Sequence, residues 1–313
     1  MTQIKIQNIP FMKHRWLLLA LSFALVLASL IVIGVKGLNY GTDFTGGLKL
    51  IVKFSEPVNE DAIGKSLSEA GLSNYIVQRF GEKKEDTFIV KSDLPKDREE
   101  KFSEPYLAAL NKSFGDGKVQ ILQEEFVGPK VGQELRTKGI YAVLWAWLIM
   151  LVYIGFRFDF YFAPGAILAL VHDVIVAVGL FALLGLEVNL TVVAAILTII
   201  GYSINDTIVV MDRIRENLQR HKGMGLVPTV DLSLNETLSR TIITSATVFT
   251  VVLILYLFSE GDIKNFAFAM TIGVLTGTYS SISIASPVFI FLKQHGHRFG
   301  FGKPQATGLK AKA

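Results

Sequence analysis

The sequence predicts a polytopic α-helical membrane protein with six transmembrane helices and one α+β domain outside the membrane. Of its 313 residues, 51% are hydrophobic and only 19% are charged, and the mean hydropathy is +0.45. Soluble domains average about 25% charged residues. The apolar excess lies in long uncharged blocks, whereas residues 36–138 carry 16 Lys or Arg and 17 Asp or Glu. The absence of cysteine excludes disulfide frameworks, thiol catalysis and Cys-ligated zinc.

Six apolar blocks are long enough to cross a bilayer, whose hydrocarbon core needs about 20 apolar residues in a helix. The blocks are 16–35, 139–156, 160–186, 188–210, 241–258 and 265–292. A cleaved signal peptide is the alternative for the first block. Its apolar run is longer than the 7–15 residues of a signal core, and no small-x-small cleavage site follows. We therefore expect an uncleaved anchor.

The basic residues predict the orientation of the helices, because Lys and Arg concentrate in cytoplasmic segments. Both ends of the chain, residues 1–15 and 293–313, and the loops after the second and fourth blocks are basic. The residues concerned are Lys5, Lys13, Arg15, Arg157, Arg213, Arg215, Arg220, Lys222, Lys293, Arg298, Lys303, Lys310 and Lys312. We expect both termini in the cytoplasm, residues 36–138 on the other side, and helices two to six within residues 139–292. The net charge of +4 is mild, and we expect no nucleic-acid partner.

Residues 36–138 have the length and polarity of an independent small domain. Alternating and helical patterns predict strands at 48–54, 74–80, 87–91 and 119–126 and helices at 59–70 and 97–114. The order βαββαβ is that of a ferredoxin-like domain. Pro129 favours the start of a helix that leads back to the membrane. The domain contains no histidine, and we expect no metal or cofactor in it.

Two acidic residues interrupt the apolar blocks, and a charge at membrane depth costs roughly 2.5–3.5 kcal/mol on insertion scales. Asp173 follows His172 near the middle of the third block. It is either a proton-binding carboxylate beside an imidazole or part of a buried pair that ties helices together. The two side chains are about 100° apart on a helix, so they need not share a partner.

Asp206 lies within a turn of the cytoplasmic end of the fourth block. Its neighbours make a polar face over three turns, because Tyr202, Ser203 and Arg213 share its side of the helix. Further polar residues are Asn205 and Asp212. The alternative is an interfacial carboxylate that pairs with Arg213, but a polar stripe facing lipid would be costly. We therefore interpret Asp206 as functional.

Arg240 begins the fifth block at about the depth of Asp206, so the two side chains could pair across helices. Arg240 could equally be a plain positive-inside anchor. Gly201, Gly273 and Gly277 are predicted to allow close helix packing, as is the serine-rich run after Gly277. A proton that neutralises Asp206 would break any pair with Arg240. Moving one charge through the membrane field yields about 2.3 kcal/mol per 100 mV, which could drive the outer domain.

A glycine-rich loop joins the first block to the first strand, and a local turn explains its glycines. Its residues are Gly41, Asp43, Phe44, Gly46 and Gly47.

The sequence resembles the SecD/SecF family of protein-export membrane subunits, within the resistance–nodulation–division superfamily. The resemblance covers nearly the whole chain and rests on five runs, which are residues 40–47, 127–132, 172–173, 201–217 and 240–245. It implies the shorter of the family's two halves, which is not an enzyme and uses proton flow to drive late protein translocation across the bacterial inner membrane. The proton-relay residues that it implies are Asp206, Arg240, Asp173 and His172. It also implies SecD as partner in a twelve-span unit, with the SecYEG channel and the unfolded exported polypeptide.

Two other functions remain open from the sequence. A half-transporter for a small molecule or lipid would share the proton chemistry but needs a substrate pocket. An intramembrane aspartyl protease would use Asp173 and Asp206, which lie at different predicted depths. The Gly-x-Gly-Asp pattern expected for such a protease is absent.

Overall fold

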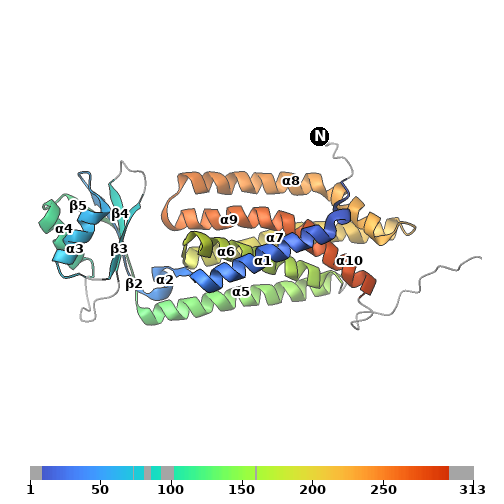
Figure 1. Ribbon diagram of the computed structural model, residues 1–313, viewed down its shortest axis with the longest axis horizontal. Helices are drawn as coiled ribbons and strands as arrows, with labels where there is room; N and C mark the ends of the chain where they lie inside the picture. The colour runs from blue at the N-terminus through green and yellow to red at the C-terminus, as the bar shows by residue number, and fades with distance from the viewer. Residues whose placement is uncertain (1–8, 73, 81–85, 93–101, 159–160, 296–313) are drawn as a thin grey trace, which may run out of the picture.

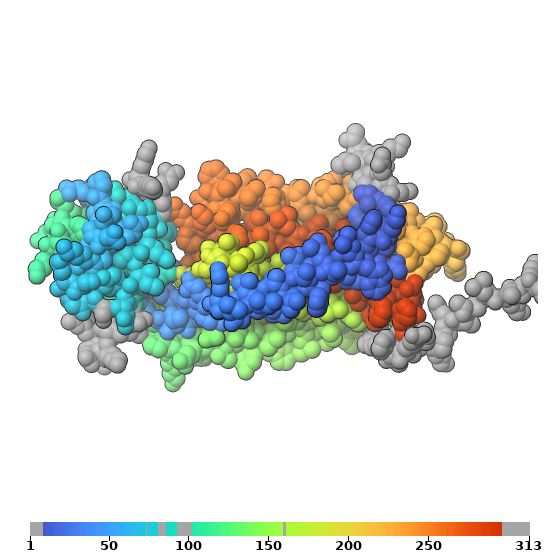
Figure 2. All heavy atoms as spheres, viewed as in Figure 1, coloured from blue at the N-terminus to red at the C-terminus, as the bar shows by residue number. Residues whose placement is uncertain are grey.

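The computed structural model describes residues 9–72, 74–80, 86–92, 102–158 and 161–295. A bundle of long helices carries a small sheet domain at one end (Figure 1). The space-filling view shows this domain as a separate lobe at the end of the bundle (Figure 2). The predicted basic tail from residue 296 onward, most of the predicted turn at 81–86 and the start of the predicted helix at 97–114 lie outside the described residues.

Six helices or helix runs are long and apolar enough to cross a membrane, which confirms the predicted number. A short 3₁₀ turn, Phe11–His14, leads into the first of them. The helices are α1 (Arg15–Lys36), α5 (Pro129–Arg157), α6 (Ala163–Leu184), α7 (Leu190–Arg220), α8 (Leu226–Phe258) and α9 (Gly261–Ser280), which continues through a π-helical turn (Ser281–Ala285) into α10 (Ser286–His295). In their most apolar 18-residue stretches, half or more of α6, α7 and the α9–α10 run is buried, whereas α1, α5 and α8 lie at the periphery.

Several helices extend well beyond their apolar blocks. The helix α5 begins at Pro129, as predicted from the proline, so it already runs through the last ten residues assigned to the outer domain. The helix α8 begins 15 residues before its block. Its first turns are polar because they bind other segments. Asp231 accepts a hydrogen bond from the amide of Met12 (2.8 Å), and Asn235 accepts one from the amide of Ile9 (2.8 Å).

The outer domain is a four-stranded antiparallel sheet with two helices on one face. Its elements are β2 (Gly47–Phe54), α3 (Glu60–Glu69), β3 (Tyr75–Phe80), β4 (Thr87–Ser92), α4 (Glu104–Phe114) and β5 (Val119–Val127). The strand order in the sheet is β3-β4-β2-β5. The chain order is the predicted βαββαβ; the ferredoxin-like assignment of the domain stays a prediction. The domain boundaries also stay predictions.

The two faces of this sheet have different roles. Leu48, Leu50, Val52 and Phe88 pack with α3 and α4 in the domain core. The helices α3 and α4 cover the face of the sheet that is directed away from the helix bundle, so the other face of the sheet is directed toward the bundle (Figure 1). Alternation along β2 places Lys49 on that face.

A compact junction lies between the outer domain and the bundle. After α1 the chain forms β1 (Asn39–Tyr40), which pairs in parallel with β6 (Glu187–Val188) in the loop between α6 and α7. The glycine-rich loop then forms the short helix α2 (Thr42–Thr45) before it enters β2. The junction therefore joins the start of the outer domain to the segment that leads into α7.

Candidate functional site

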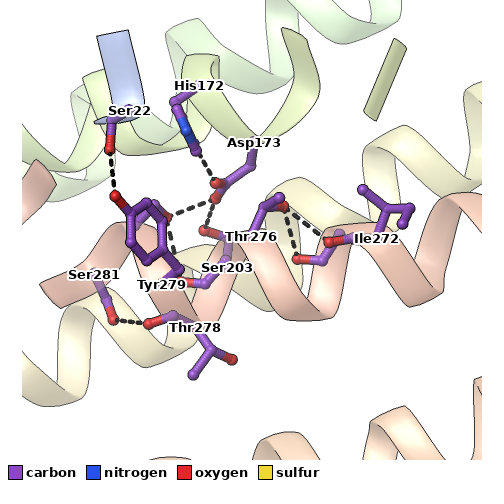
Figure 3. A network of polar contacts seen from close by, with 12 residues as sticks. Ser22, His172, Asp173, Ser203, Ile272, Thr276, Thr278, Tyr279 and Ser281 are labelled. Carbon is purple, nitrogen blue, oxygen red and sulfur yellow. Dashed lines mark hydrogen bonds and ion pairs between the residues drawn. The ribbon is translucent and has the colours of Figure 1, made fainter. Parts of the chain in front are cut away.

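Asp173 is fully buried in α6, where three helices meet. Its Oδ2 accepts hydrogen bonds from the hydroxyl of Ser203 on α7 (2.6 Å) and from that of Ser280 at the end of α9 (2.8 Å). Its Oδ1 lies 2.9 Å from Nδ1 of His172. Figure 3 shows the side chains of His172 and Ser203 directed toward the carboxylate. The carboxylate thus joins α6 to both of the other buried helices.

His172 contacts its sequence neighbour Asp173 directly. The imidazole is 3% exposed, and its ring lies 6.1 Å from the ring of Tyr279. Among the described residues its Nε2 atom has no hydrogen-bond partner. The hydroxyl of Tyr279 donates to the carbonyl of Leu18 (3.0 Å) and accepts from Ser22 (3.1 Å), so this side of the site contacts α1.

Asp206 is buried one turn beyond Ser203 on α7. Its Oδ1 accepts a hydrogen bond from Thr241 of α8 (2.5 Å), and its Oδ2 accepts one from Ser281 (2.6 Å). Asp206 is 7% exposed. This second carboxylate therefore joins α7 to α8 and to the π-helical turn.

The two carboxylates are linked through consecutive residues. Ser280 binds Asp173, and Ser281 binds Asp206. Both serines stand where α9 changes into a π-helical turn, a distortion that often occurs at functional sites. Sequence analysis identified the serine-rich run only as a packing surface and missed these partners and Thr241. The available signal was the number of hydroxyl residues within an uncharged span.

The predicted pair between Asp206 and Arg240 differs from the structure. Arg240 is exposed, and within the described part of the chain no ion pair joins it to Asp206. Its neighbour Thr241 turns inward and binds the carboxylate instead. Arg240 is still near enough to interact electrostatically with Asp206. The alternative partner, Arg213, binds Glu216 (2.6 Å) and Glu236 (2.7 Å).

The supporting polar residues differ in their exposure. The hydroxyl of Tyr202 donates to Ser245 of α8 (3.0 Å), while Asn205 and Asp212 lie on exposed faces of α7.

Two of the three predicted packing glycines contact α7. A Cβ atom at Gly273 would collide with the side chain of Ile199, and one at Gly277 would lie 3.0 Å from Cβ of Ser203. Gly201 is exposed and has nothing of the described chain within 4 Å of such an atom, so its packing role stays a prediction.

The glycine-rich loop does more than turn the chain. Oδ2 of Asp43 accepts a hydrogen bond from the amide of Leu190, the first residue of α7 (2.9 Å). The amide of Gly41 donates to the carbonyl of Val188 (2.9 Å), and Phe44 is buried in the core of the bundle. The loop is therefore fixed to the beginning of the helix that carries Asp206.

Glycine is required where this loop meets α5. Gly46 has a φ of +74° and Gly47 a φ of +138°, conformations that other residues rarely adopt. A Cβ atom on Gly132 of α5 would stand 2.9 Å from the amide nitrogen of Gly46. The two backbones thus approach closely, without room for a side chain.

Charged side chains connect the bundle-facing side of the outer sheet to the segments where α9 and α7 begin. Nζ of Lys49 on β2 lies 2.8 Å from Asp262 at the start of α9 and 3.2 Å from Glu125 on β5. Lys91 on β4 pairs with Glu187 of β6. Burial favours the neutral form of Lys49, but its two carboxylate partners outweigh burial and raise the pKa of its ammonium group. Burial, together with the charge of Lys49, lowers the pKa of Lys91.

No group of three or more His, Asp or Glu side chains in the described ranges is arranged to hold a metal ion. The chemistry that the site offers is that of two shielded carboxylates among hydroxyl groups. The fold and the site therefore define a class of protein: a multi-pass membrane protein with two buried carboxylates and an outer α+β domain.

The chain belongs to the SecD/SecF family of protein-export membrane proteins. The family model for the C-terminal part of SecD and SecF matches residues 106–295, and the model for the SecD/SecF GG motif matches residues 31–58. The chain is 42% identical over 295 residues to protein translocase subunit SecF of Desulfurispirillum indicum, covering 92% of this chain and 93% of that one. It is 42% identical over 275 residues to SecF of Haemophilus influenzae, covering 88% and 83%.

Solved structures of SecDF share the fold. The crystal structure of SecDF from Thermus thermophilus, described as a translocon-associated membrane protein, aligns with a TM-score of 0.81 at 35% identity. The alignment covers 94% of this chain and 40% of the SecDF chain. A SecDF structure in a super-membrane-facing form aligns with a TM-score of 0.71 at 34% identity. This chain therefore spans well under half the length of the solved SecDF chain.

Proposed function

We propose that this protein is a SecF-type export subunit that couples proton flow through its membrane domain to late steps of protein translocation. The observation that carries the proposal is the bonding of Asp206, whose two carboxylate oxygens each accept a hydrogen bond from a buried hydroxyl group. A hydroxyl can either donate or accept a hydrogen bond. The same partners therefore satisfy an ionised carboxylate and, after rotation of a hydroxyl, a protonated one. The hydroxyl of Ser281 has a second acceptor in reach, the carbonyl of Thr278 (3.0 Å), so the site can bind a proton without leaving that hydroxyl unpaired.

The available energy is sufficient for a conformational change. One charge that crosses the membrane field yields about 2.3 kcal/mol per 100 mV. Since 1.4 kcal/mol corresponds to a tenfold change in an equilibrium, one proton shifts a two-state equilibrium about 40-fold per 100 mV. Protonation of Asp206 alters its bonds to α8 and to the π-helical turn, which makes the packing of these helices the natural two-state element.

A partner half is part of the proposal. On α7 the polar or small residues Thr198, Gly201 and Asn205 lie exposed on one face, and Arg240 lies exposed on α8. Polar groups facing lipid are costly, whereas small residues let another helix approach closely. A SecD subunit that covers this face would complete a twelve-span unit, consistent with the greater length of the solved SecDF chain.

The proposed setting is the bacterial inner membrane, with both termini in the cytoplasm and residues 36–138 on the outer side. The distribution of basic residues supports this orientation. The further proposed partners are the SecYEG channel and the unfolded polypeptide that leaves it.

The test is export by proteoliposomes that contain this subunit, SecD and the channel, with and without an imposed proton gradient. Asp206→Asn keeps the size of the side chain but cannot bind and release the proton. We expect it to abolish the gradient-dependent part of export, and Asp173→Asn to reduce that part. Asp116→Asn, at an exposed position of the outer domain, is the control and should leave export unchanged. Full gradient-dependent export by the Asp206→Asn protein would refute the proposal.

A further inference from the structure

Two different kinds of contact join the outer domain to the helix bundle. The first is the packed junction of the glycine-rich loop, where Gly46 and Gly132 bring two backbones together and Asp43 binds the first amide of α7. No side chain fits between these backbones. This contact can act as a pivot but cannot open without disrupting the packing of α5.

The second contact is polar and borders open space. Lys49 pairs with Asp262 at 2.8 Å, and Lys91 pairs with Glu187. The side-chain amide of Asn265 also donates a hydrogen bond to the backbone carbonyl of Glu187 (3.3 Å). A cavity of about 350 Å³ lies at this contact, and all five residues line it. Polar interfaces between domains allow relative motion more readily than apolar ones.

Each ion pair of this second contact leads to one of two helices, α9 and α7, whose hydroxyl groups bind the carboxylates. Asp262 lies in the first turn of α9, and Ser280 and Ser281 follow 18 and 19 residues later, or about 27–29 Å along a helix. Glu187 stands three residues before α7, which carries Ser203 and Asp206. A shift of α9 relative to α7 therefore changes the spacing of the two anchors beneath the outer sheet.

We propose that the Lys49–Asp262 and Lys91–Glu187 ion pairs form a clamp between the outer sheet and the segments where α9 and α7 begin. This clamp opens and closes in each export cycle. The glycine-rich junction acts as the pivot of the movement. This inference rests on the proposed function, since it supplies the connection from the carboxylates to the outer domain. The clamp residues are positioning residues that transmit movement, and they bind no proton in transit.

Charge exchange tests whether the pairing itself matters. Lys49→Asp and Asp262→Lys each place like charges together, and we expect each to lower gradient-dependent export at least tenfold without loss of the complex with SecD. Because Glu125 also lies 3.2 Å from Lys49, both substitutions are combined with Glu125→Gln, which restores an opposite pair without a like charge beside it and should recover most of the export. The matched control exchanges Lys118 and Glu56, an exposed pair with a 2.6 Å contact elsewhere in the outer domain, and should change nothing. Failure of the combined substitution to exceed either single one would refute the clamp.

Crosslinking tests whether the clamp must open. The chain contains no cysteine, so Lys91→Cys with Glu187→Cys introduces a unique pair that a reducible bismaleimide can bridge. We expect bridging to reduce gradient-dependent export at least tenfold relative to the unbridged double-cysteine protein, which keeps the Lys49–Asp262 pair, and cleavage of the bridge to restore the unbridged level. The control bridges Lys65→Cys and Glu69→Cys, which lie one turn apart on α3. Undiminished export by the protein bridged at positions 91 and 187 would overturn the proposed opening.

The same experiments separate this inference from the proposed function. If the unsubstituted protein exports equally well without a proton gradient, the proton-coupled function fails, whatever the crosslink does. If export depends on the gradient and on Asp206 but not on the clamp, the function stands and the clamp is refuted.

Discussion

The hydrogen bond from the amide of Leu190 to Asp43 offers a sharp test of how the outer domain is fixed to α7. Asp43→Ala removes both an acceptor and a negative charge at a helix N-terminus, whereas Asp43→Asn keeps an acceptor and removes the charge. A side-chain acceptor at a helix start contributes about 0.5–2 kcal/mol, and a negative charge there about 0.3–1 kcal/mol. We therefore expect a local loss of about 1–2 kcal/mol for Asp43→Ala and less than about 1 kcal/mol for Asp43→Asn.

Amide hydrogen exchange measures this loss where it occurs. A loss of 1–2 kcal/mol corresponds to a roughly 5–30-fold change in an opening equilibrium, so exchange at Leu190 should accelerate by that factor in the Asp43→Ala protein. Val192 should be affected less, because Asn189 accepts its hydrogen bond (3.0 Å). The matched control is Asn59→Ala, which removes the equivalent acceptor at the start of α3 and should leave α7 unchanged. Unaltered exchange at Leu190 in the Asp43→Ala protein would show that the loop does not hold the helix.

Two further predictions concern the two contacts between the outer domain and the bundle. Gly132→Ala places a methyl group 2.9 Å from a backbone nitrogen and should lower the stability of the bundle by about 1–3 kcal/mol, measured as a thermal shift. Gly128→Ala, with open space within 4 Å, should have a much smaller effect. Competitive amine labelling with rising pH should find that Lys91 titrates below 10.5 and Lys49 above it, because their pKa values are shifted in opposite directions from that value. The stability contributed by Lys49 is then fully present below pH 10.5 and is lost as the pH rises through its raised pKa; titration of both lysines at the ordinary value would contradict the clamp environment.

The number of membrane helices follows from the sequence because uncharged blocks of bilayer length have few other uses. The ends of the helices do not follow in the same way. Outside the apolar block, the start of α8 is held by bonds such as that between Asp231 and the amide of Met12, 219 residues away in the chain. Hydropathy carries no information about a partner so distant. Pro129 is the exception, since its missing amide proton and fixed φ mark a helix start locally.

The site was predictable in its charged members and not in their partners. Asp173 and Asp206 stand out because acidic residues are costly in an apolar block. The hydroxyl groups that hold them do not stand out, since Ser and Thr on a membrane helix can satisfy themselves by bonding to their own backbone, as Thr271 does to Ala267 (2.7 Å). Only the spatial meeting of α6, α7 and α9 selects Ser203 and Ser280 from the others. Of the two interpretations left open for Arg240, the structure shows no ion pair with Asp206 within the described residues, because the inward-facing direction at the start of the fifth span belongs to the next residue, Thr241.

The π-helical turn explains how adjacent residues can hold both carboxylates. In a regular α-helix consecutive side chains point about 100° apart, so Ser280 and Ser281 address different neighbours. The wider turn that follows leaves the hydrogen-bonding ladder irregular, and the hydroxyl of Ser286 binds the carbonyl of Ser281, five residues earlier (3.0 Å). A change in the bond between Ser281 and Asp206 therefore acts on a segment whose backbone is already out of α-helical register. Ser280, the residue immediately before Ser281, binds Asp173. The two carboxylates are therefore structurally coupled at this turn.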